Sequence, residues 1–205
     1  MNQALKRLYL ASRNPRRREL LNQIGVSFET LLFRNGERAD SQVNLTPLSG
    51  EAPVDYVQRI ARAKAGYGGG LVVERRLVAL PVLAAATTLE IDGAIIGKAG
   101  DAEEAARILS QLGGRSHRVF TSVAVCWGGH IDCVLSCSEV TLRPLTQAEI
   151  ERYVRTGEPL EKPGAYAMQG RAAAFIERLE GSYTGVVGLP LCETASLLNA
   201  IGFEI

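Results

Sequence analysis

Residues 8–21 constrain the fold of this chain more than any other segment. They read LYLASRNPRRRELL, which is an apolar run, a polar turn and then a stretch of helical composition. Asn14 is a favourable helix N-cap, and Pro15 then occupies the first helical position, where its missing N–H costs nothing. A short buried strand over 8–11 that leads directly into a helix through about Ile24 is typical of α/β proteins.

The rest of the chain alternates strands and helices at first and forms hairpins later. Apolar spacing predicts helices over 53–65, 102–112, 147–156 and 191–200, and strands over 26–33, 77–88 and 173–176. Asp92–Gly93 and Gly128–Gly129 mark hairpin turns, the second within a long hairpin over 116–145. We expect the run Tyr67-Gly-Gly-Gly70 to end the helix that begins at Pro53, and residues 34–52 to form a loop. The expected fold is a mixed, twisted α/β sheet with helices on its faces, in one domain over residues 1–205.

The charge balance argues against a general binder of nucleic acid or membranes. The 205 residues include 23 Lys and Arg against 22 Asp and Glu, a net charge of +1, so an anion site must be local. No aromatic residue lies between the arginines of residues 13–18 to stack on bases. The longest apolar stretch, residues 77–86, is interrupted by Pro81 and far too short to span a membrane.

The cysteines and the beginning of the sequence favour a reducing, cytoplasmic location. Only four apolar residues follow Lys6–Arg7 before a new arginine, too few for a signal-peptide core. The four cysteines do not have the spacing of zinc ligands, so we expect buried free thiols at the following positions: Cys126, Cys133, Cys137 and Cys192.

The turn between the first strand and helix has the chemistry of an anion site. A helix N-terminus presents unpaired N–H groups and a partial positive charge, Ser12 adds a hydroxyl donor, and Arg16 and Arg17 can fork onto phosphate oxygens. Basic residues in a first helical turn oppose the helix dipole, which an anion would offset. The alternative is an exposed basic helix face, and these residues alone do not decide between the two.

Four further polar residues stand in settings that need explanation. Lys64 shares a face with the apolar residues of its predicted helix, Lys98 follows a glycine after the second predicted hairpin strand, and Glu37 is isolated in the polar loop. Gln169 lies among small residues that would let a ligand approach the backbone closely. Taken singly, the two lysines and Glu37 would be interpreted as solvated side chains.

Together these residues resemble the Maf family of nucleotide pyrophosphatases. ASRNPRRREL is similar to the family's ASxSPRRxELL signature. The resemblance continues, in the expected order, through the blocks YVQRIARAKA, PVLAAATTLEIDGAIIGKAGDAEEA, HRVFTSVAV, GEPLEKPGAYAMQG and GSYTGVVGLPL. It therefore covers nearly the whole chain.

The resemblance implies a fold like that of the inosine triphosphate pyrophosphatases (Maf/Ham1), with two lobes around a cleft. It implies hydrolysis of a nucleoside triphosphate to its monophosphate and pyrophosphate, with a divalent metal, Mg²⁺ or Mn²⁺. Carried over by position, the residues expected to bind substrate are Ser12, Arg16, Arg17, Lys64, Thr87 and Gln169. Lys98 would bind the triphosphate at the catalytic centre, and Glu37 would hold the metal or assist the water.

Two blocks of the sequence resemble the branch that acts on pyrimidine nucleotides. Thr87 and the block 164–170 match the pattern of the dTTP and UTP branch rather than that of the branch acting on methylated GTP. A pyrimidine nucleoside triphosphate is therefore the expected substrate. The sequence leaves the oligomeric state open, a homodimer included.

Ala86 departs from the family pattern at its central carboxylate. Where the family has GADTT, this chain has Ala84-Ala-Ala86-Thr87-Thr88, and the acidic residues usual before Glu37 are Arg34, Asn35 and Gly36. Loss of a general base costs about 10²–10⁴-fold in rate. Either Ala86 is a single inactivating substitution in an otherwise active enzyme, or the metal-binding region has diverged as a whole. An impaired pyrophosphatase and a non-catalytic nucleotide-binding protein that acts on cell division through a partner both remain open.

Overall fold

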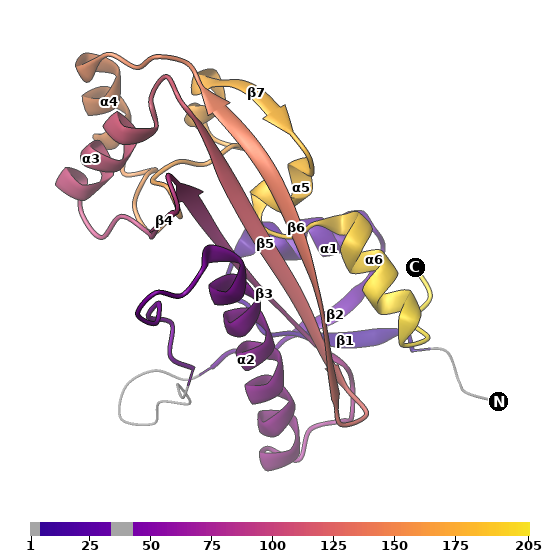
Figure 1. The fold of residues 1–205 in the computed structure, drawn as a ribbon. Coiled ribbons are helices and arrows are strands. Elements are labelled where there is room, and N and C mark those ends of the chain that lie inside the picture. Colours follow the sequence, from indigo (N-terminus) through magenta and orange to yellow (C-terminus); the bar gives the residue numbers. More distant parts are fainter. Residues whose placement is uncertain (1–4, 34–42) are drawn as a thin grey trace.

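In the part of the chain that the structure describes, seven strands form one mixed sheet (Figure 1). The computed structural model describes residues 5–33 and 43–205. The strands are β1 Arg7–Leu10, β2 Ser27–Thr30, β3 Val82–Ile91, β4 Ala94–Ile96, β5 Ser116–Trp127, β6 His130–Leu142 and β7 Ile176–Glu180. The helices are α1 Pro15–Gln23, α2 Pro53–Glu74, α3 Ala102–Leu112, α4 Gln147–Val154, α5 Tyr183–Val187 and α6 Leu191–Ala200.

The sheet is parallel at one side and antiparallel over the rest. Its strand order is β2-β1-β3-β5-β6-β7, with β4 paired to β3 outside this path. β1 runs parallel to both β2 and β3, whereas β3, β5, β6 and β7 pair antiparallel. The predicted mixed α/β sheet is confirmed. That the chain forms a single domain remains our proposal.

The first strand and helix form as the sequence predicts. The side chain of Asn14 caps α1 by accepting a hydrogen bond of 2.9 Å from the Arg16 amide, and Pro15 is the first helical residue. Leu8 and Leu10 of β1 are fully buried. On α1, Leu21 is fully buried and Leu20 nearly so. The turn at 11–14 is therefore fixed from both sides by the core.

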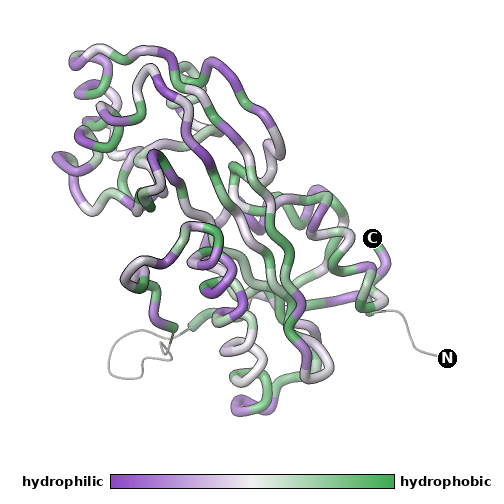
Figure 2. The backbone as a smooth tube through the Cα atoms, in the orientation of Figure 1, coloured by the Kyte–Doolittle hydropathy of each residue, from purple (hydrophilic) through white to green (hydrophobic). Residues whose placement is uncertain are grey.

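Different helices pack against the two faces of β3. Val82, Ala84 and Ala86 pack in the cluster that contains the apolar face of α2, whereas Leu83 and Ala85 pack with α1 and α6. This alternation follows from the two-residue period of a strand, and both faces are apolar because helices cover both. Figure 2 shows the hydrophobic stretches following the central strands.

Helix α2 is longer than predicted, because its glycines pack against the sheet instead of ending the helix. It runs on through the glycine run to Glu74. A Cβ atom at Gly68 would lie 2.7 Å from Val82 Cγ1, and one at Gly69 would lie 2.7 Å from Cys126 Sγ. The glycines therefore allow a close approach of helix and sheet, and this tertiary contact outweighs their poor helix propensity.

Two tight turns were predicted correctly from their residues. Asp92 and Gly93, with φ of 53° and 81°, join β3 to β4, and Gly128 and Gly129, with φ of 59° and 82°, join β5 to β6. Positive φ at both central residues is the requirement of a type I′ hairpin turn. The β5–β6 hairpin is the longest element pair of the sheet and runs along the length of the molecule (Figure 1).

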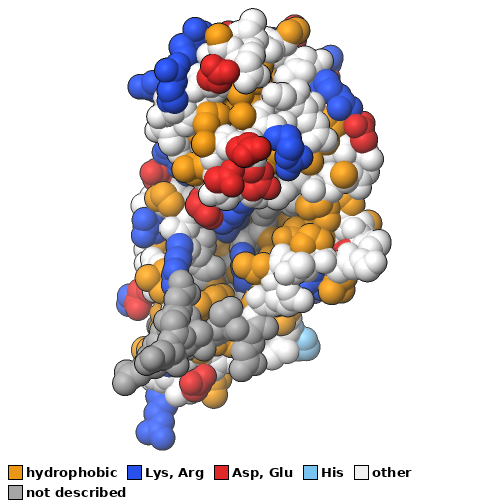
Figure 3. Space-filling view, turned by 90° about the vertical axis from the view of Figure 1, so that its left-hand side faces the viewer, with side chains coloured by type: hydrophobic (Ala, Val, Ile, Leu, Met, Phe, Trp, Pro, Cys, Tyr) orange, Lys and Arg blue, Asp and Glu red, His pale blue; other side chains and the backbone are white. Residues whose placement is uncertain are grey.

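A hollow separates two groups of helices. α3 and α4 pack on one end of the long hairpin in a cluster of their own, while α1, α2 and α6 pack toward the other end (Figure 1). Figure 3 shows a hollow between these parts, with acidic side chains along its upper edge and several basic side chains beside it. The arrangement agrees with the two lobes that the family resemblance implies.

Five local features of the described structure differ from the predictions. The strand expected over 26–33 is only four residues long, the one over 77–88 is shifted to Val82–Ile91, and residues 171–175 form a 3₁₀ turn before β7. α5 was not predicted, because its five residues are too few to show a helical period. The thiols are free but not buried, since Cys137 and Cys192 are exposed and Cys126 and Cys133 are half-buried. None of the described helices is long and apolar enough to cross a membrane.

Candidate functional site

The turn at the start of α1 presents both backbone and side-chain donors. Ser12 follows β1, is 9% exposed, and accepts a hydrogen bond of 3.2 Å from the Asn14 amide. Arg16 lies in the exposed first turn of α1 and donates to Glu19 at 3.0 Å. This ion pair is surface-exposed and therefore weak, so the Arg16 side chain can turn toward an anion at small cost.

Arg17 is buried and bound on several sides. Its Nε donates to the carbonyl of Gly188 at 2.8 Å, and its Nη1 donates to the carbonyl of Ala85 at 2.9 Å and to Ser12 Oγ at 3.3 Å. Its Nη2 donates to Thr87 Oγ1 at 3.3 Å. Burial lowers the pKa of Arg17 to about 10, which leaves the guanidinium charged at neutral pH. Arg17 thus ties α1 to β3 and to the segment after α5.

Thr87 lies on the opposite face of β3 from Ala86. Its hydroxyl is 2.9 Å from the hydroxyl of Thr121, which is its partner in the β3–β5 register. Thr121 is 1% exposed and donates to the carbonyl of Gly185 at 2.7 Å. The family resemblance gives Thr87 a place in substrate binding, and the structure places its hydroxyl between two protein groups.

Lys64 is the polar member of the buried stripe of α2. It stands one or two turns from Val57, Ile60, Gly68 and Leu71, all of which are buried against the sheet. Gly68 of α2 lies against Val82 of β3, and the two elements run in opposite directions (Figure 1). The part of α2 that precedes Gly68 therefore lies over the part of β3 that follows Val82, which includes Ala86. Because helical side chains lean toward the helix N-terminus, we expect the Lys64 ammonium to point along β3 toward the level of Ala86.

The charge around Lys64 is positive. Burial and, to a lesser extent, the nearby charges of Arg17 and Lys98 together lower the pKa of Lys64 to about 8. The Lys64 ammonium on α2 is therefore within electrostatic range of a cation on α1 and of another in the segment after β4. Such a group is stabilised when an anion with several negative oxygens binds to it.

Lys98 and Gln169 belong to the segments that meet beside β4. Lys98 pairs with Pro163 in a β-bridge, and its Nζ lies 3.6 Å from a carboxylate oxygen of Glu161. Both partners of this pair are mostly exposed, so Lys98 remains available to a ligand. Gln169 is exposed on a turn, and its placement beside the other expected site residues stays a prediction.

Ala86 is buried on the α2 face of β3. It is 6% exposed, lies opposite Ser122 in the β3–β5 register, and shares its core cluster with Ala61 and Ala65, which flank Lys64 on α2. A methyl group here can neither take a proton nor hold a metal. The position at which the family resemblance leads us to expect a carboxylate therefore carries no charge.

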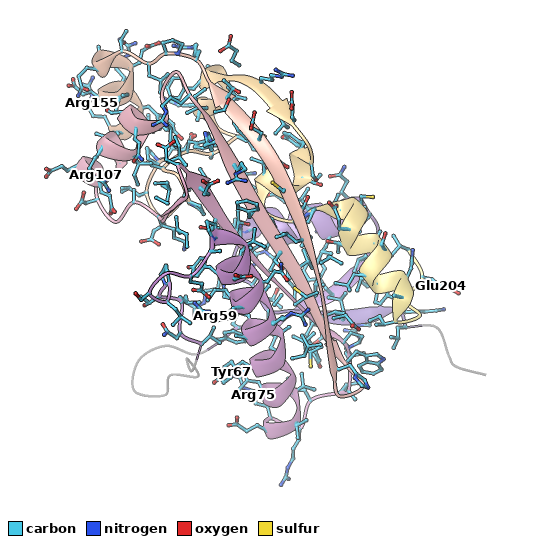
Figure 4. The ribbon with its side chains drawn as sticks, viewed as in Figure 1. Arg59, Tyr67, Arg75, Arg107, Arg155 and Glu204 are labelled. Atoms are coloured by element: carbon cyan, nitrogen blue, oxygen red, sulfur yellow. The ribbon has the colours of Figure 1, made fainter. Side chains whose placement is uncertain are left out.

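The described carboxylates do not fit a resident divalent metal at this position. In the part of the chain that the structure describes, no three His, Cys, Asp or Glu side chains are grouped so that they could hold a metal ion. Glu37, the expected metal ligand, lies in residues 34–42, outside the described residues. The segment that follows is held to α2 by Arg59, which points toward it in Figure 4 and donates to Glu51 at 2.6 and 2.7 Å.

Three residues that hold Arg17 and Thr87 in place were not predicted from the sequence. Thr121, Gly185 and Gly188 all contact the Arg17–Thr87 pair or its partners, yet none was singled out from the sequence. A signal was present at Gly188, whose φ of 126° only glycine adopts readily. Thr121 gave no such signal, because a threonine in a β-strand is ordinary.

Comparisons with known proteins identify the family. The family profile described as "Maf-like protein" matches residues 7–201. A protein of Dechloromonas aromatica (strain RCB) named dTTP/UTP pyrophosphatase is 58% identical over 198 residues, which cover 97% of this chain and 98% of that protein. A protein of the same name from Aromatoleum aromaticum is 56% identical over 200 residues and 97% of each chain. In structure, the Staphylococcus aureus Ham1 protein is 14% identical and covers 67% of this chain and 72% of its own, with a TM-score of 0.45. The family profile and these full-length relatives show that the chain belongs to the Maf family.

Proposed function

We propose that this chain binds pyrimidine nucleoside triphosphates and hydrolyses them to the monophosphate and pyrophosphate. The observation that carries the proposal is that the half-buried Lys64 of α2 lies within electrostatic range of Arg17, in the first turn of α1, and of Lys98, in the segment after β4. A triphosphate has the charge to be attracted by all three cations and the length to contact both lysines. The relatives named dTTP/UTP pyrophosphatase support dTTP and UTP as the substrates.

In the reaction, the oxygen of water bonds to the α-phosphorus as the bond from that phosphorus to the bridging oxygen of the β-phosphate breaks. The water proton is taken up by a base, and pyrophosphate leaves with the bridging electrons. Negative charge grows on the leaving pyrophosphate, so fixed cations stabilise this transition state more than the ground state. Arg16, Lys64, Lys98 and the Ser12 hydroxyl would supply this stabilisation, and Arg17 would add its charge.

The missing group in this scheme is the base. Ala86 stands where the family resemblance expects a carboxylate, and Glu90, the next carboxylate on the same face of β3, is bound to Arg118 and to the Gly93 amide. The reaction is therefore expected to be slow in this sequence. A second function, nucleotide binding without turnover, is favoured by the same observation, because an intact basic group beside a missing base binds but does not hydrolyse.

Two further expectations belong to this proposal. A divalent ion is expected with the triphosphate, and its effect is tested by comparing Mg²⁺, Mn²⁺ and a chelator. A reducing cytoplasmic location is supported by the four free cysteines.

A ligand screen tests the binding proposal. Melting temperature is measured with each common nucleoside triphosphate and with inorganic triphosphate, because a ligand that binds only the native state raises it. The proposal expects the largest rise with dTTP and UTP. No rise with any triphosphate, in a protein that melts cooperatively, would refute it.

A further inference from the structure

We propose that Arg17 is a positioning residue, which turns the Ser12 hydroxyl toward the phosphate site and is itself held in place by Thr87 and Thr121. The inference rests on the proposed triphosphate binding. Under this proposal, Arg17 and Thr87 act by holding other groups in place and not by binding the phosphates directly. Thr121 then joins the residues on which nucleotide binding depends.

The donors of Arg17 are almost all occupied by the protein. A guanidinium has five N–H groups. Four of them donate to Gly188 O, Ala85 O, Ser12 Oγ and Thr87 Oγ1. One N–H, on Nη2, has no acceptor among the described residues. Arginine binds a phosphate in fork fashion through two parallel hydrogen bonds, which Arg17 cannot make without breaking some of its present ones.

The contacts to Ser12 determine the direction of its hydroxyl. Ser12 Oγ accepts from the Asn14 amide at 3.2 Å and from Arg17 Nη1 at 3.3 Å. A hydroxyl oxygen has two lone pairs and one proton. Both lone pairs are occupied by these donors, so the proton remains free to donate to a phosphate oxygen. Arg17 therefore fixes Ser12 as a donor before the ligand arrives.

The direction of the Thr87–Thr121 hydrogen bond follows from counting protons. Thr121 donates its only hydroxyl proton to the carbonyl of Gly185 at 2.7 Å, since a carbonyl can only accept. In the 2.9 Å contact between the two threonines, Thr87 must then be the donor. The Thr87 oxygen is left to accept from Arg17 Nη2. The chain runs in one direction, from Arg17 through Thr87 and Thr121 to Gly185.

This chain links the α5 segment to the phosphate turn. Thr121 is 1% exposed and contacts Gly185 of α5, while Arg17 Nε contacts Gly188 just after it. Every acceptor of Arg17 among the described residues is neutral, so its position depends on these hydrogen bonds rather than on an ion pair. Removing one link lets the guanidinium move, and Ser12 then loses one of the two donors that orient it.

A double-mutant cycle between Ser12 and Thr121 tests the proposal. The measurement is the dissociation constant of dTTP and of UTP by calorimetry, for the parent, Ser12→Ala, Thr121→Val and the double variant. A hydrogen bond to a charged group is worth about 1.5–3 kcal/mol, so Ser12→Ala is expected to weaken binding about tenfold or more. Thr121→Val is expected to weaken it about fivefold, Thr121→Ser to restore it, and the double variant to bind no worse than Ser12→Ala.

Thr194→Val is the matched control. Thr194 is a fully buried threonine of α6 whose hydroxyl has no hydrogen-bond partner among the described residues, so the same substitution there should leave affinity unchanged. If Thr121→Val does not fold, Thr87→Val interrupts the same chain at a half-buried position and takes its place in the cycle.

The outcomes separate this inference from the proposed function. The positioning role would be overturned if Thr121→Val bound the nucleotides as tightly as the parent does. It would also be overturned if the double variant lost affinity by the product of the two single losses. Either result would leave triphosphate binding itself intact. A folded parent that binds no triphosphate would refute both.

Discussion

Glu90 and Arg118 face each other across the β3–β5 ladder, and the Arg118 guanidinium donates to the Glu90 carboxylate through Nε. The second oxygen of Glu90 accepts from the Gly93 amide in the β3–β4 turn. The hydrogen bond from Arg118 holds the pKa of Glu90 below its usual value, although Glu90 is only 3% exposed. Glu90 is the next carboxylate along β3 on the Ala86 face, roughly 13 Å from Ala86 at strand rise. It serves the turn and cannot replace the missing base.

The affinity for triphosphate should fall above pH 8. Lys64 has a pKa lowered to about 8 by burial and by the charges of Arg17 and Lys98, so it loses its proton as the pH rises through 8. Binding then requires uptake of a proton, and the affinity is expected to fall up to about tenfold between pH 8 and 9. Calorimetric titrations of UTP from pH 7 to 9 check this. Lys64→Arg keeps its charge and should abolish the dependence, and a flat profile for the parent would show that Lys64 does not contact the phosphates.

Arg16 should contribute directly to affinity. Its side chain is exposed beside the α1 N-terminus, and its only ion pair in the described structure is the surface contact with Glu19. Arg16→Ala is expected to raise the dissociation constant of dTTP at least about tenfold, the loss of one charged hydrogen bond. Arg18→Ala removes an equally exposed neighbouring charge and should change it by less than about threefold. Equal effects of the two would indicate only a diffuse basic surface.

Two neighbouring glycines of α2 should respond oppositely to alanine. A Cβ atom at Gly68 would lie 2.7 Å from Val82 Cγ1, so Gly68→Ala forces helix and sheet apart and is expected to destabilise the fold by about 1–3 kcal/mol. Gly70 has no atom within 4 Å of the same position, and Gly70→Ala should stabilise by about 0.5–1 kcal/mol through helix propensity. Urea unfolding of the two variants measures both. A stabilised Gly68→Ala would mean that α2 packs less closely than described.

Stability should decline in mild acid because of His117. His117 is 2% exposed, its Nε2 pairs with the Tyr166 hydroxyl at 2.8 Å, and burial lowers its pKa to about 4. Between pH 6.5 and 4 the unfolded chain therefore binds a proton that the folded chain does not, and stability falls as the pH is lowered through this range. His117→Gln should flatten this part of the profile of melting temperature against pH. An unchanged slope in that variant would assign the acid sensitivity to other groups.

The elements defined by local chemistry were predictable from the sequence. The Asn14 cap, the Pro15 position and the Asp92–Gly93 turn each depend on residues close in the chain. The length of α2 was not predictable, because Gly68 is explained only by Val82 on a distant strand. The role proposed for Thr121 was not predictable for the same reason, because its hydroxyl bonds to Thr87 on β3 and to Gly185 on α5, which only the fold brings together. Ala86 could be identified only because the family pattern expects a carboxylate there.

Pyrophosphate release by Ala86→Asp tests the central claim most directly. The new carboxylate would lie on the α2 face of β3 beside the basic group, and Ala86→Asn provides a variant of the same shape that cannot act as a base. With Mg²⁺ or Mn²⁺, we predict that Ala86→Asp releases pyrophosphate from dTTP or UTP at least about tenfold faster than the parent, while Ala86→Asn does not. If Ala86→Asp folds but releases pyrophosphate no faster than the parent from any common triphosphate, the proposal that this chain is built as a nucleotide pyrophosphatase is contradicted.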